Sequence, residues 1–485
     1  MDESGFWLTR LCFQRGLGLI YLVAFLVAAR QFAPLCGEHG LLPIRRFTER
    51  VSFFQAPSLF HLWSSDHATR AAAWTGVVLS LLVVTGATDS FGLPLSLLAW
   101  AVLWVLYLSF VNVGQTFYAF GWESILLEAG FLAIFLGPTE MAAPGLVIWL
   151  IRWLLFRVMF GAGLIKLRGD PCWRNLTCLR YHYETQPIPN PLSWYLHRLP
   201  NPVHSAGVLF THFVELVVPF GYFAPAPVCW IAGAFTILFQ GVLIISGNLS
   251  WLNYVTIILA VGCFDDVALA TVLPLAVPDV VPAPAWHQGT VRAVTIMTAA
   301  MSYLPIRNML SSDQAMNASY NPFHLVGTYG AFGGITRRRF EVILEGTHDE
   351  DITDDTRWLA YEFKAKPGNP SRRPRVIAPY HLRLDWLMWF AAMSGHRHHP
   401  WFVPLVVRLL QGDRATLKLL AHNPFPERPP RYVRAELYLY RFTTRQQRQE
   451  TGRWWWRVRV GSYLAPVSLA SPAASRLLGV HGWRH

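Results

Sequence analysis

Six ionisable side chains lie within or beside long apolar stretches of the sequence, where a membrane would make them costly. They are Glu123, Glu128, Arg152, Arg157, Lys166 and Glu215. A charged group near the centre of a bilayer is expensive to insert, so it needs a partner or serves a function. A lysine that is desolvated in this way can also serve as a general base.

The stretch at 146–167 carries three of these residues, and helical geometry separates them. At about 100° per residue, Arg152 and Lys166 fall within roughly 40° of one helix face, and Arg157 points to the opposite side. Two interpretations stay open. The arginines either form interhelical ion pairs with glutamates of this set, or the set lines a polar cavity that handles a ligand or a proton. Lys166 lies near a helix end, so its side chain could also extend to the membrane interface.

The segment 169–187 follows this stretch and is rich in aromatic and polar residues. Loops of this size carry function more often than short connectors do. The candidate side chains are Trp173, Tyr181, Tyr183 and Glu184. The alternative is a structured cap over the helix ends.

Two further features of the sequence depend on which side of a membrane they face. Cys172 and Cys178 could form a small disulfide in an oxidising compartment. Asn175, Asn248 and Asn317 each begin an Asn-x-Ser/Thr sequence, which accepts a glycan only on a lumenal face.

The sequence lacks the common catalytic motifs. It contains no G-x-S-x-G nucleophile elbow, no H-E-x-x-H, no phosphate-binding P-loop and no C-x-x-C. These absences disfavour a serine lipase and a nucleotide-driven pump. We expect no metal site and no bound cofactor.

The elements that must position these residues are membrane spans. Apolar residues make up 53% of the chain and charged residues 14%, whereas an average soluble domain carries about 25% charged residues. About 20 apolar residues cross a bilayer, and 124–136 is either a short span or a re-entrant piece. We expect about seven spans, chosen from 17–32, 71–87, 93–111, 146–167, 206–223, 227–246, 251–274 and 291–304.

The charge distribution predicts a second, water-facing domain. Residues 1–319 contain 16 basic and 16 acidic residues, whereas residues 320–485 contain 25 and 13 and so carry the whole net charge of +12. We therefore expect a multi-span transmembrane domain at 1–310 and a basic, strand-rich domain at 311–485. The fold class is an α-helical multi-pass membrane domain followed by a β-rich α+β soluble domain.

Local patterns give the elements of this second domain. Alternating β-branched and aromatic residues predict strands at 340–345, 358–363, 432–441 and 454–460. Amphipathic patterns predict short helices at 384–393 and 401–411. Arginines interleave with tryptophans at 453–459, as they do in some nucleic-acid binders. On a membrane-tethered domain we expect anionic headgroups or an acidic client instead, and no nucleic acid; a solvated strand face is the alternative.

Four stretches of the sequence resemble the lipase maturation factor family. The first is Gly-Gln-Thr-Phe-Tyr-Ala-Phe-Gly-Trp-Glu-Ser-Ile-Leu-Leu-Glu-Ala-Gly at 114–130. The second is 152–166 with the loop 169–187, which ends in Tyr-His-Tyr-Glu-Thr-Gln-Pro at 181–187. The third is Asn-Pro-Phe-His-Leu-Val-Gly-Thr-Tyr-Gly-Ala-Phe-Gly at 321–333, which leads into 340–346, and the fourth is Ala-His-Asn-Pro-Phe-Pro-Glu-Arg-Pro-Pro at 421–430. This resemblance covers nearly the whole chain. It implies a membrane-embedded, chaperone-like and non-catalytic factor that helps secreted lipases fold and assemble into active dimers.

The resemblance also implies a location, and the loop and the basic domain suggest a mechanism. The membrane would be that of the endoplasmic reticulum in a eukaryote and the plasma membrane in a bacterium, and the partner a secreted lipase or another exported client. We expect exposed aromatic side chains at Tyr181, Tyr183 and Trp194, together with the basic domain, to hold a partly folded client. The ionisable set and the loop residues would then form a client-binding or structural polar cluster.

A second, shorter resemblance supports an enzyme. Ala-Gly-Leu-Ile-Lys-Leu-Arg-Gly-Asp-Pro-Cys-Trp at 162–173 is similar to a segment of the vitamin K-dependent carboxylase superfamily. Its catalytic members place their base lysine where Lys166 stands. The alternative function is therefore a membrane enzyme that uses Lys166 as a base on a lipid-soluble cofactor or substrate.

Overall fold

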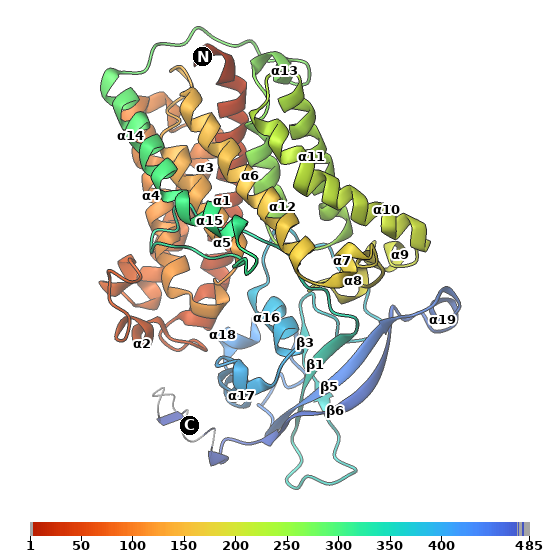
Figure 1. Ribbon diagram of the computed structural model, residues 1–485. Coiled ribbons are helices and arrows are strands. Elements are labelled where there is room, and N and C mark those ends of the chain that lie inside the picture. Colours follow the sequence, from red (N-terminus) through yellow and green to blue (C-terminus); the bar gives the residue numbers. More distant parts are fainter. Residues whose placement is uncertain (1–2, 473, 475–477, 480–485) are drawn as a thin grey trace.

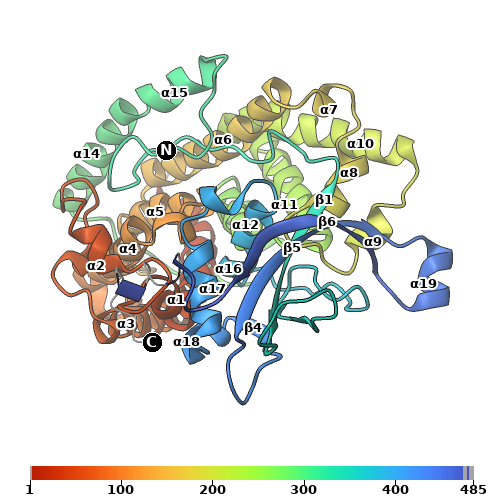
Figure 2. The same ribbon diagram turned by 90° about the horizontal axis from the view of Figure 1, so that it is seen from below.

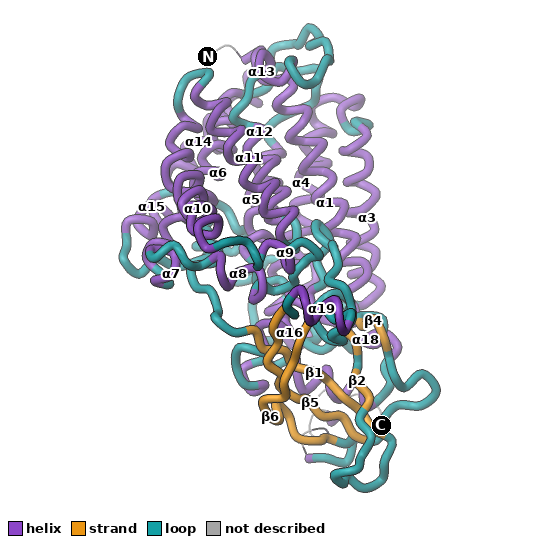
Figure 3. The backbone as a smooth tube through the Cα atoms, turned by 90° about the vertical axis from the view of Figure 1, so that its right-hand side faces the viewer, coloured by secondary structure: helices purple, strands orange, loops and turns teal. Residues whose placement is uncertain are grey.

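The computed structural model describes residues 3–472, 474 and 478–479, and these form a bundle of long helices joined to a smaller region built on a sheet. In Figure 1 the bundle occupies the upper part of the molecule and the sheet lies beneath one of its ends. Figure 3 shows the strands gathered below the helices in a view from the side. The last residues of the predicted second domain, 480–485, lie outside the described residues.

Six helical segments of the described chain are long and apolar enough to cross a membrane. The predicted fold class is therefore confirmed. Two predicted stretches form shorter helices: 251–274 contains α12 (Leu252–Val261), and 291–304 spans the end of α14 (Ala285–Met301) and the start of α15 (Tyr303–Leu310). The six are Trp7–Cys36 (α1), Asp66–Thr85 (α3), Asp89–Val113 (with α4 at Gly92–Val113), Gly145–Arg168 (α6), Asn201–Phe223 and Val228–Ser246 (α11). The fifth of these consists of α10 (Asn201–His212), η5 (Phe213–Val217) and η6 (Val218–Phe223).

The short stretch 124–136 forms a helix, α5 (Gly121–Ile134), that is buried among the longer ones. It contacts α1, α4, α6 and α12. A Cβ atom at Gly130 would lie 1.9 Å from Tyr21 Oη of α1, so the close approach of these two helices requires glycine at this position. Because α5 is enclosed, its two glutamates lie inside the bundle.

Short helices connect and flank the bundle. Two of them, α7 and α8, lie in the segment 169–187 that sequence analysis treated as a loop. In Figure 2, α14 and α15 lie at the edge of the bundle seen from below. Their bounds are Ile44–Thr48 (α2), Pro171–Arg174 (α7), Leu179–Thr185 (α8), Ser193–Leu196 (α9) and Asp266–Ala270 (α13).

The second region is an antiparallel sheet with strand order β2-β1-β5-β6 and a two-stranded sheet of β3 and β4. The strands are Arg339–Thr347 (β1), Leu359–Ala360 (β2), Glu362–Phe363 (β3), Leu420–His422 (β4), Tyr432–Phe442 (β5) and Trp455–Val467 (β6). The helices are Arg383–Ala391 (α16), Phe402–Leu410 (α17), Arg414–Leu417 (α18) and Arg445–Thr451 (α19). Three of the four predicted strands and both predicted helices are confirmed. The fourth predicted strand, 358–363, forms two short strands, β2 and β3, which pair in different sheets.

The apolar core runs without interruption from the bundle into the second region. A single cluster of buried residues includes Phe117 beside the bundle and Trp401 beside α17, whose ring centroids are 6.4 Å apart. The helix α15 ends at Leu310. The two regions share this core, so it does not mark a boundary between two domains. The predicted division into 1–310 and 311–485 therefore stays a prediction.

Candidate functional site

The first buried charge cluster joins α5 and α6 to the glycine-rich segment that follows residue 324. Arg157 donates to both carboxylate oxygens of Glu128, with 3.2 Å between Nη1 and Oε2, and Arg157 Nη1 donates to Gly327 O at 2.6 Å. Glu128 Oε2 also accepts from Tyr329 Oη at 2.7 Å and from Gly327 N at 3.2 Å. A Cβ at Gly161 would lie 2.4 Å from Tyr329 O, so this glycine lets the segment pack against α6.

A second cluster ties the C-terminal region into the bundle. Arg383 at the start of α16 donates to Glu123 Oε1 at 2.8 Å and to Phe117 O at 2.6 Å. Tyr107 of α4 donates to the other oxygen of Glu123. The Arg383 guanidinium also lies 3.4 Å from the centroid of the Tyr118 ring. Glu123 thus holds the neighbouring helices α4 and α5 to α16, which is 260 residues away in the sequence.

The third cluster is an ion pair between α6 and the segment Phe213–Val217 (η5), which belongs to the fifth long helix. Lys166 Nζ lies 2.6 Å from Glu215 Oε1 and 2.7 Å from Oε2, and 5.4 Å from the centroid of the Trp173 ring. Lys166 is 4% exposed, so it is buried beside Glu215 instead of extending to the interface. Both residues line a cavity of about 790 Å³ between the bundle and the C-terminal region.

The predicted pairing of Arg152 with a glutamate is wrong. Arg152 Nε donates to Gly262 O at 2.7 Å, just after the end of α12, and its guanidinium lies 5.4 Å from the Trp149 ring centroid. The acidic residues expected as partners pair instead with Arg383, Arg157 and Lys166. Carbonyl groups at the end of a helix lack partners within the helix. Arg152 donates to one of them and thereby also satisfies its own guanidinium.

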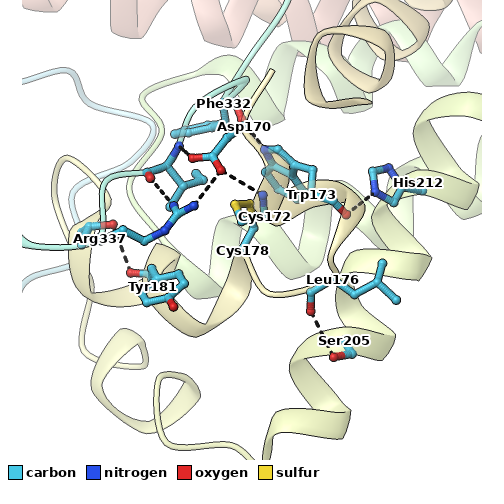
Figure 4. Close-up of a disulfide and its surroundings, with 12 residues drawn as sticks. Asp170, Cys172, Trp173, Leu176, Cys178, Tyr181, Ser205, His212, Phe332 and Arg337 are labelled. Atoms are coloured by element: carbon cyan, nitrogen blue, oxygen red, sulfur yellow. Dashed lines mark hydrogen bonds and ion pairs between the residues drawn. A yellow bond between two sulfur atoms is a disulfide. The ribbon is translucent and has the colours of Figure 1, made fainter. Parts of the chain in front are cut away.

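The segment 169–187 is a compact cap that is bonded to residues 332–337 (Figure 4). Asp170 accepts from Cys172 N at 2.9 Å and from Arg337 Nη2 at 2.6 Å, and Trp173 Nε1 donates to Phe332 O at 2.8 Å. Cys172 and Cys178 form a disulfide. The Arg337 guanidinium lies 4.8 Å from the centroid of the Tyr181 ring.

Asp170 and His182 of this cap have lowered pKa values. Burial opposes ionisation of Asp170, but the hydrogen bonds from Arg337, Cys172 N and Ile335 N outweigh it and lower the pKa of the Asp170 carboxyl. Burial, with a smaller effect of the Lys166 charge, lowers the pKa of His182 to about 4. His182 is therefore neutral at neutral pH, and it also lines the cavity.

The end of the cap is held by a buried arginine of the sheet. Arg339 of β1 donates to the main-chain oxygens of Glu184, Gln186 and Pro187 at 3.0, 2.5 and 3.0 Å. The Glu184 carboxylate accepts from Phe442 N at 2.8 Å, and burial raises its pKa. Arg339 also pairs with Glu341 at 2.6 Å, and Lys366 with Glu341 at 2.9 Å.

The expectation that Tyr181, Tyr183 and Trp194 are exposed is wrong for Tyr183 and Trp194, and Tyr181 is only half-buried. Tyr183 is 9% exposed and Trp194 is 4% exposed. Trp194 packs with Tyr440, Phe442 and Trp455 of the sheet, and its Nε1 donates to Thr443 O at 3.1 Å. These two rings point inward and fill the space between the bundle and the sheet. The rings therefore offer no free surface to a client.

Sequence reasoning missed the charged residues that the C-terminal region adds to the site. Arg383 lies 260 residues from Glu123 in the sequence. Arg339 and Glu341 lie in a strand, and the strand pattern predicts only that side chains alternate between the two faces of the sheet. One signal was available: Arg339 and Glu341 are two apart in a strand, and so on one face. They form an ion pair on that face.

The site and the fold together define an integral membrane protein. The buried ion pair of Arg383 with Glu123 joins the apolar helical bundle to the α+β region, whereas Arg157–Glu128 and Lys166–Glu215 are ion pairs within the bundle. The described residues contain no group of three or more His, Cys, Asp or Glu that could hold a metal ion.

Comparisons with known proteins identify the family. Residues 8–271 match the family model for the lipase maturation factor transmembrane domain, and residues 325–465 match the one for the lipase maturation factor C-terminal domain. The chain belongs to the lipase maturation factor family.

Curated relatives share most of their length with this chain. It is 46% identical to lipase maturation factor 1 of Bos taurus, over 96% of this chain and 89% of the relative, and 45% identical to the Homo sapiens protein of that name, over 97% and 89%. It is 32% identical to lipase maturation factor 2 of Homo sapiens, over 99% and 85%. No solved structure gives a significant match.

Proposed function

We propose that this protein assists the folding and assembly of secreted lipases, as a chaperone-like factor without a catalytic step. The names of its relatives support lipases as clients. The ion pairs of the bundle would then be structural, and the client would bind to the C-terminal region.

The observation that carries this proposal is an exposed apolar stripe on β6, the outer strand of the described sheet. Trp456, Val458 and Val460 are 45, 43 and 55% exposed, and residues two apart in a strand share a face. Trp456 and Val458 lie opposite Arg441 and Leu439 of β5.

The stripe continues a face of the sheet that is covered elsewhere. Helices α16 and α17 contact β1 and β5, so the apolar face is packed over the inner strands and bare over the outer one. Outer strands with apolar faces pair readily with other chains. A partly folded lipase offers matching apolar surface and unpaired strands.

We propose that the C-terminal region faces the lumen of the endoplasmic reticulum in a eukaryotic cell, and the outer side of the plasma membrane in a bacterial one. The disulfide between Cys172 and Cys178 favours an oxidising compartment. Asp170 of the same cap is bonded to Arg337, so cap and C-terminal region share one side of the membrane.

The glycan acceptors provide a test of this orientation. Asn175 is exposed, whereas Asn248 is buried and donates to Arg375 O at 2.8 Å. In a eukaryotic host, Asn175→Gln is expected to remove one glycan-dependent mobility step, and Asn248→Gln none. Absence of any glycan on Asn175 in the wild-type protein would contradict a lumenal cap.

The function itself is tested by co-expressing a secreted dimeric lipase with the full chain and measuring lipase activity per mass of secreted enzyme. The variant Trp456→Thr/Val458→Thr/Val460→Thr keeps residues suited to a strand and removes the apolar stripe. We expect it to lose most of the gain in lipase specific activity while inserting normally.

The matched control changes exposed aliphatic residues of the same region outside the sheet. Ile352 and Val376 are 43 and 67% exposed, and Ile352→Thr/Val376→Thr is expected to behave as wild type. Full lipase rescue by the stripe variant would refute the stripe as the client surface.

One observation favours the enzyme alternative as a second candidate: Lys166 lines the cavity. In the structure the Lys166 ammonium donates to the Glu215 carboxylate. Lys166 would therefore have to lose one of its ammonium protons before it could act as a base. The enzyme alternative predicts that Lys166→Ala abolishes function in a protein that still inserts and still binds lipase. Client maturation at wild-type level by Lys166→Ala would exclude it.

A further inference from the structure

The cavity beside Lys166 has the size of a small-molecule site. Its volume of about 790 Å³ falls within the roughly 300–1,000 Å³ of ligand pockets. Helices α5, α6, α11 and α12 line it from the bundle, and α8, α16 and residues 329–336 line it from the other side. The cavity therefore lies at the level where the spans meet the water-facing region.

Most of the lining is apolar, and its exposed part includes apolar side chains. Phe239, Leu243 and Leu252 line it within the bundle. Phe390 and Met393 of the C-terminal region are 37 and 44% exposed and lie among the lining residues. An apolar chain can therefore enter from the surface and extend between the helices.

Four buried polar atoms of the lining residues have no hydrogen-bond partner within the described part of the chain. They are Gln186 Oε1, Gln240 Oε1, Trp122 Nε1 and Trp386 Nε1. Each of these residues is at least nine-tenths buried. An unpartnered buried polar group is costly, so a ligand that supplies a donor for an amide oxygen such as that of Gln240 and an acceptor for the indoles would be stabilised here.

The charges of the lining argue against an ionic ligand. Lys166 and Glu215 neutralise each other at 2.6 Å, Asp170 is paired with Arg337, and His182 is buried and neutral. Every cation among the lining residues is thus already paired with a carboxylate. A ligand with a phosphate or carboxylate group would find no free positive charge there.

We propose that this cavity binds one uncharged single-chain amphiphile whose head carries both hydroxyl and carbonyl oxygens, as a monoacylglycerol does. The hydroxyl donates to Gln240 Oε1, the carbonyl oxygen accepts from an indole N–H, and the acyl chain lies along the apolar lining. A quinone accepts hydrogen bonds but donates none, so it would leave Gln240 unpartnered.

The test is native mass spectrometry of the full chain in detergent, titrated with 1-monooleoylglycerol, with oleate and with an isoprenoid naphthoquinone. We expect one monooleoylglycerol to bind saturably, and the other two more weakly. Gln240→Leu keeps the side-chain size and should weaken monooleoylglycerol binding about fivefold, the loss of one hydrogen bond. Ala162→Phe fills the cavity and should abolish binding.

The matched control is Gln14→Leu, because Gln14 is also a buried glutamine whose Oε1 has no partner in the described chain, and it does not line the cavity. It should bind monooleoylglycerol as wild type does. Oleate or naphthoquinone binding as tightly as monooleoylglycerol would overturn the proposal. So would wild-type affinity in Gln240→Leu, which decides the matter even where Ala162→Phe does not fold.

Discussion

The two ion pairs of α6 lie on one helix and differ in their surroundings. Arg157 and Glu128 are enclosed by the segment after residue 324, which adds hydrogen bonds from Tyr329 and Gly327 to the same carboxylate. Lys166 lies nine residues further along α6 and pairs with Glu215 of η5, and both residues border a cavity. The first pair is part of a sealed network, and the second is accessible to whatever enters the cavity.

This difference separates a structural charge from a candidate functional one. A buried pair is worth little net stability when complete, but removing one partner leaves an uncompensated charge. The cost depends on whether the remaining charge can reach water or a proton. It should therefore be largest at Arg157 and smaller at Lys166.

The largest expected effect is that of Arg157→Met. It leaves Glu128 charged in a closed site, and we expect a loss of about 3–5 kcal/mol of stability. Detergent-induced unfolding in mixed micelles measures this. Lys166→Met is the companion variant and should lose clearly less, because Glu215 borders the cavity. Equal losses in the two variants would remove the distinction between the sites.

The second prediction concerns acid stability of the cap beside the open pair. Unfolded histidine binds a proton below its ordinary pKa of 6.5, whereas His182 in the fold does so only below about 4. The neutral form is thus favoured by folding, and its contribution is lost as the pH falls from 6.5 towards 4. We expect wild-type protein to lose about 2 kcal/mol through this group between pH 7 and pH 5.

The variant His182→Leu removes that contribution. Its unfolding free energy, measured in the same micelles at pH 7 and pH 5, should fall less than that of wild type. Burial also lowers the pKa values of His197 and His381 to about 4. Both proteins should therefore still lose some unfolding free energy between pH 7 and pH 5. An identical fall in the two proteins would contradict the assignment.

The contrast between the two pairs also marks what the sequence could predict. Apolar runs locate the spans, and an ionisable residue inside a run signals a buried charge, so Glu128, Arg157, Lys166 and Glu215 were identifiable. Their partners were not all identifiable, because Arg383 reaches Glu123 across 260 residues and no local pattern records that contact. Tyr183 and Trp194 lie in stretches whose composition is typical of a surface loop. They are buried only because the bundle packs against the sheet, which no local pattern records.

The third prediction tests how sealed the first pair is. Tyr329→Phe removes one hydrogen bond to the Glu128 carboxylate, and bonds to charged groups are worth about 1.5–3 kcal/mol; we expect a loss near the lower figure. Tyr361→Phe is the control, since Tyr361 is equally buried and its hydroxyl has no partner in the described chain. That control should be neutral or slightly stabilising, and a loss equal to that of Tyr329→Phe would show that the hydrogen bond contributes nothing.

The smallest effect on stability is expected when the second pair is removed as a whole. Lys166→Met/Glu215→Leu leaves no unpaired charge, and replacing a buried pair with apolar residues is often neutral, so its unfolding free energy should lie within about 1 kcal/mol of wild type and above that of Lys166→Met. Lipase co-expression then decides what the pair is for. Full client maturation by the double variant would make Lys166 and Glu215 structural, like Arg157 and Glu128. A folded double variant that no longer matures lipase would instead assign the function to the cavity side of α6, because folding would be intact and only the charges facing the cavity would have gone.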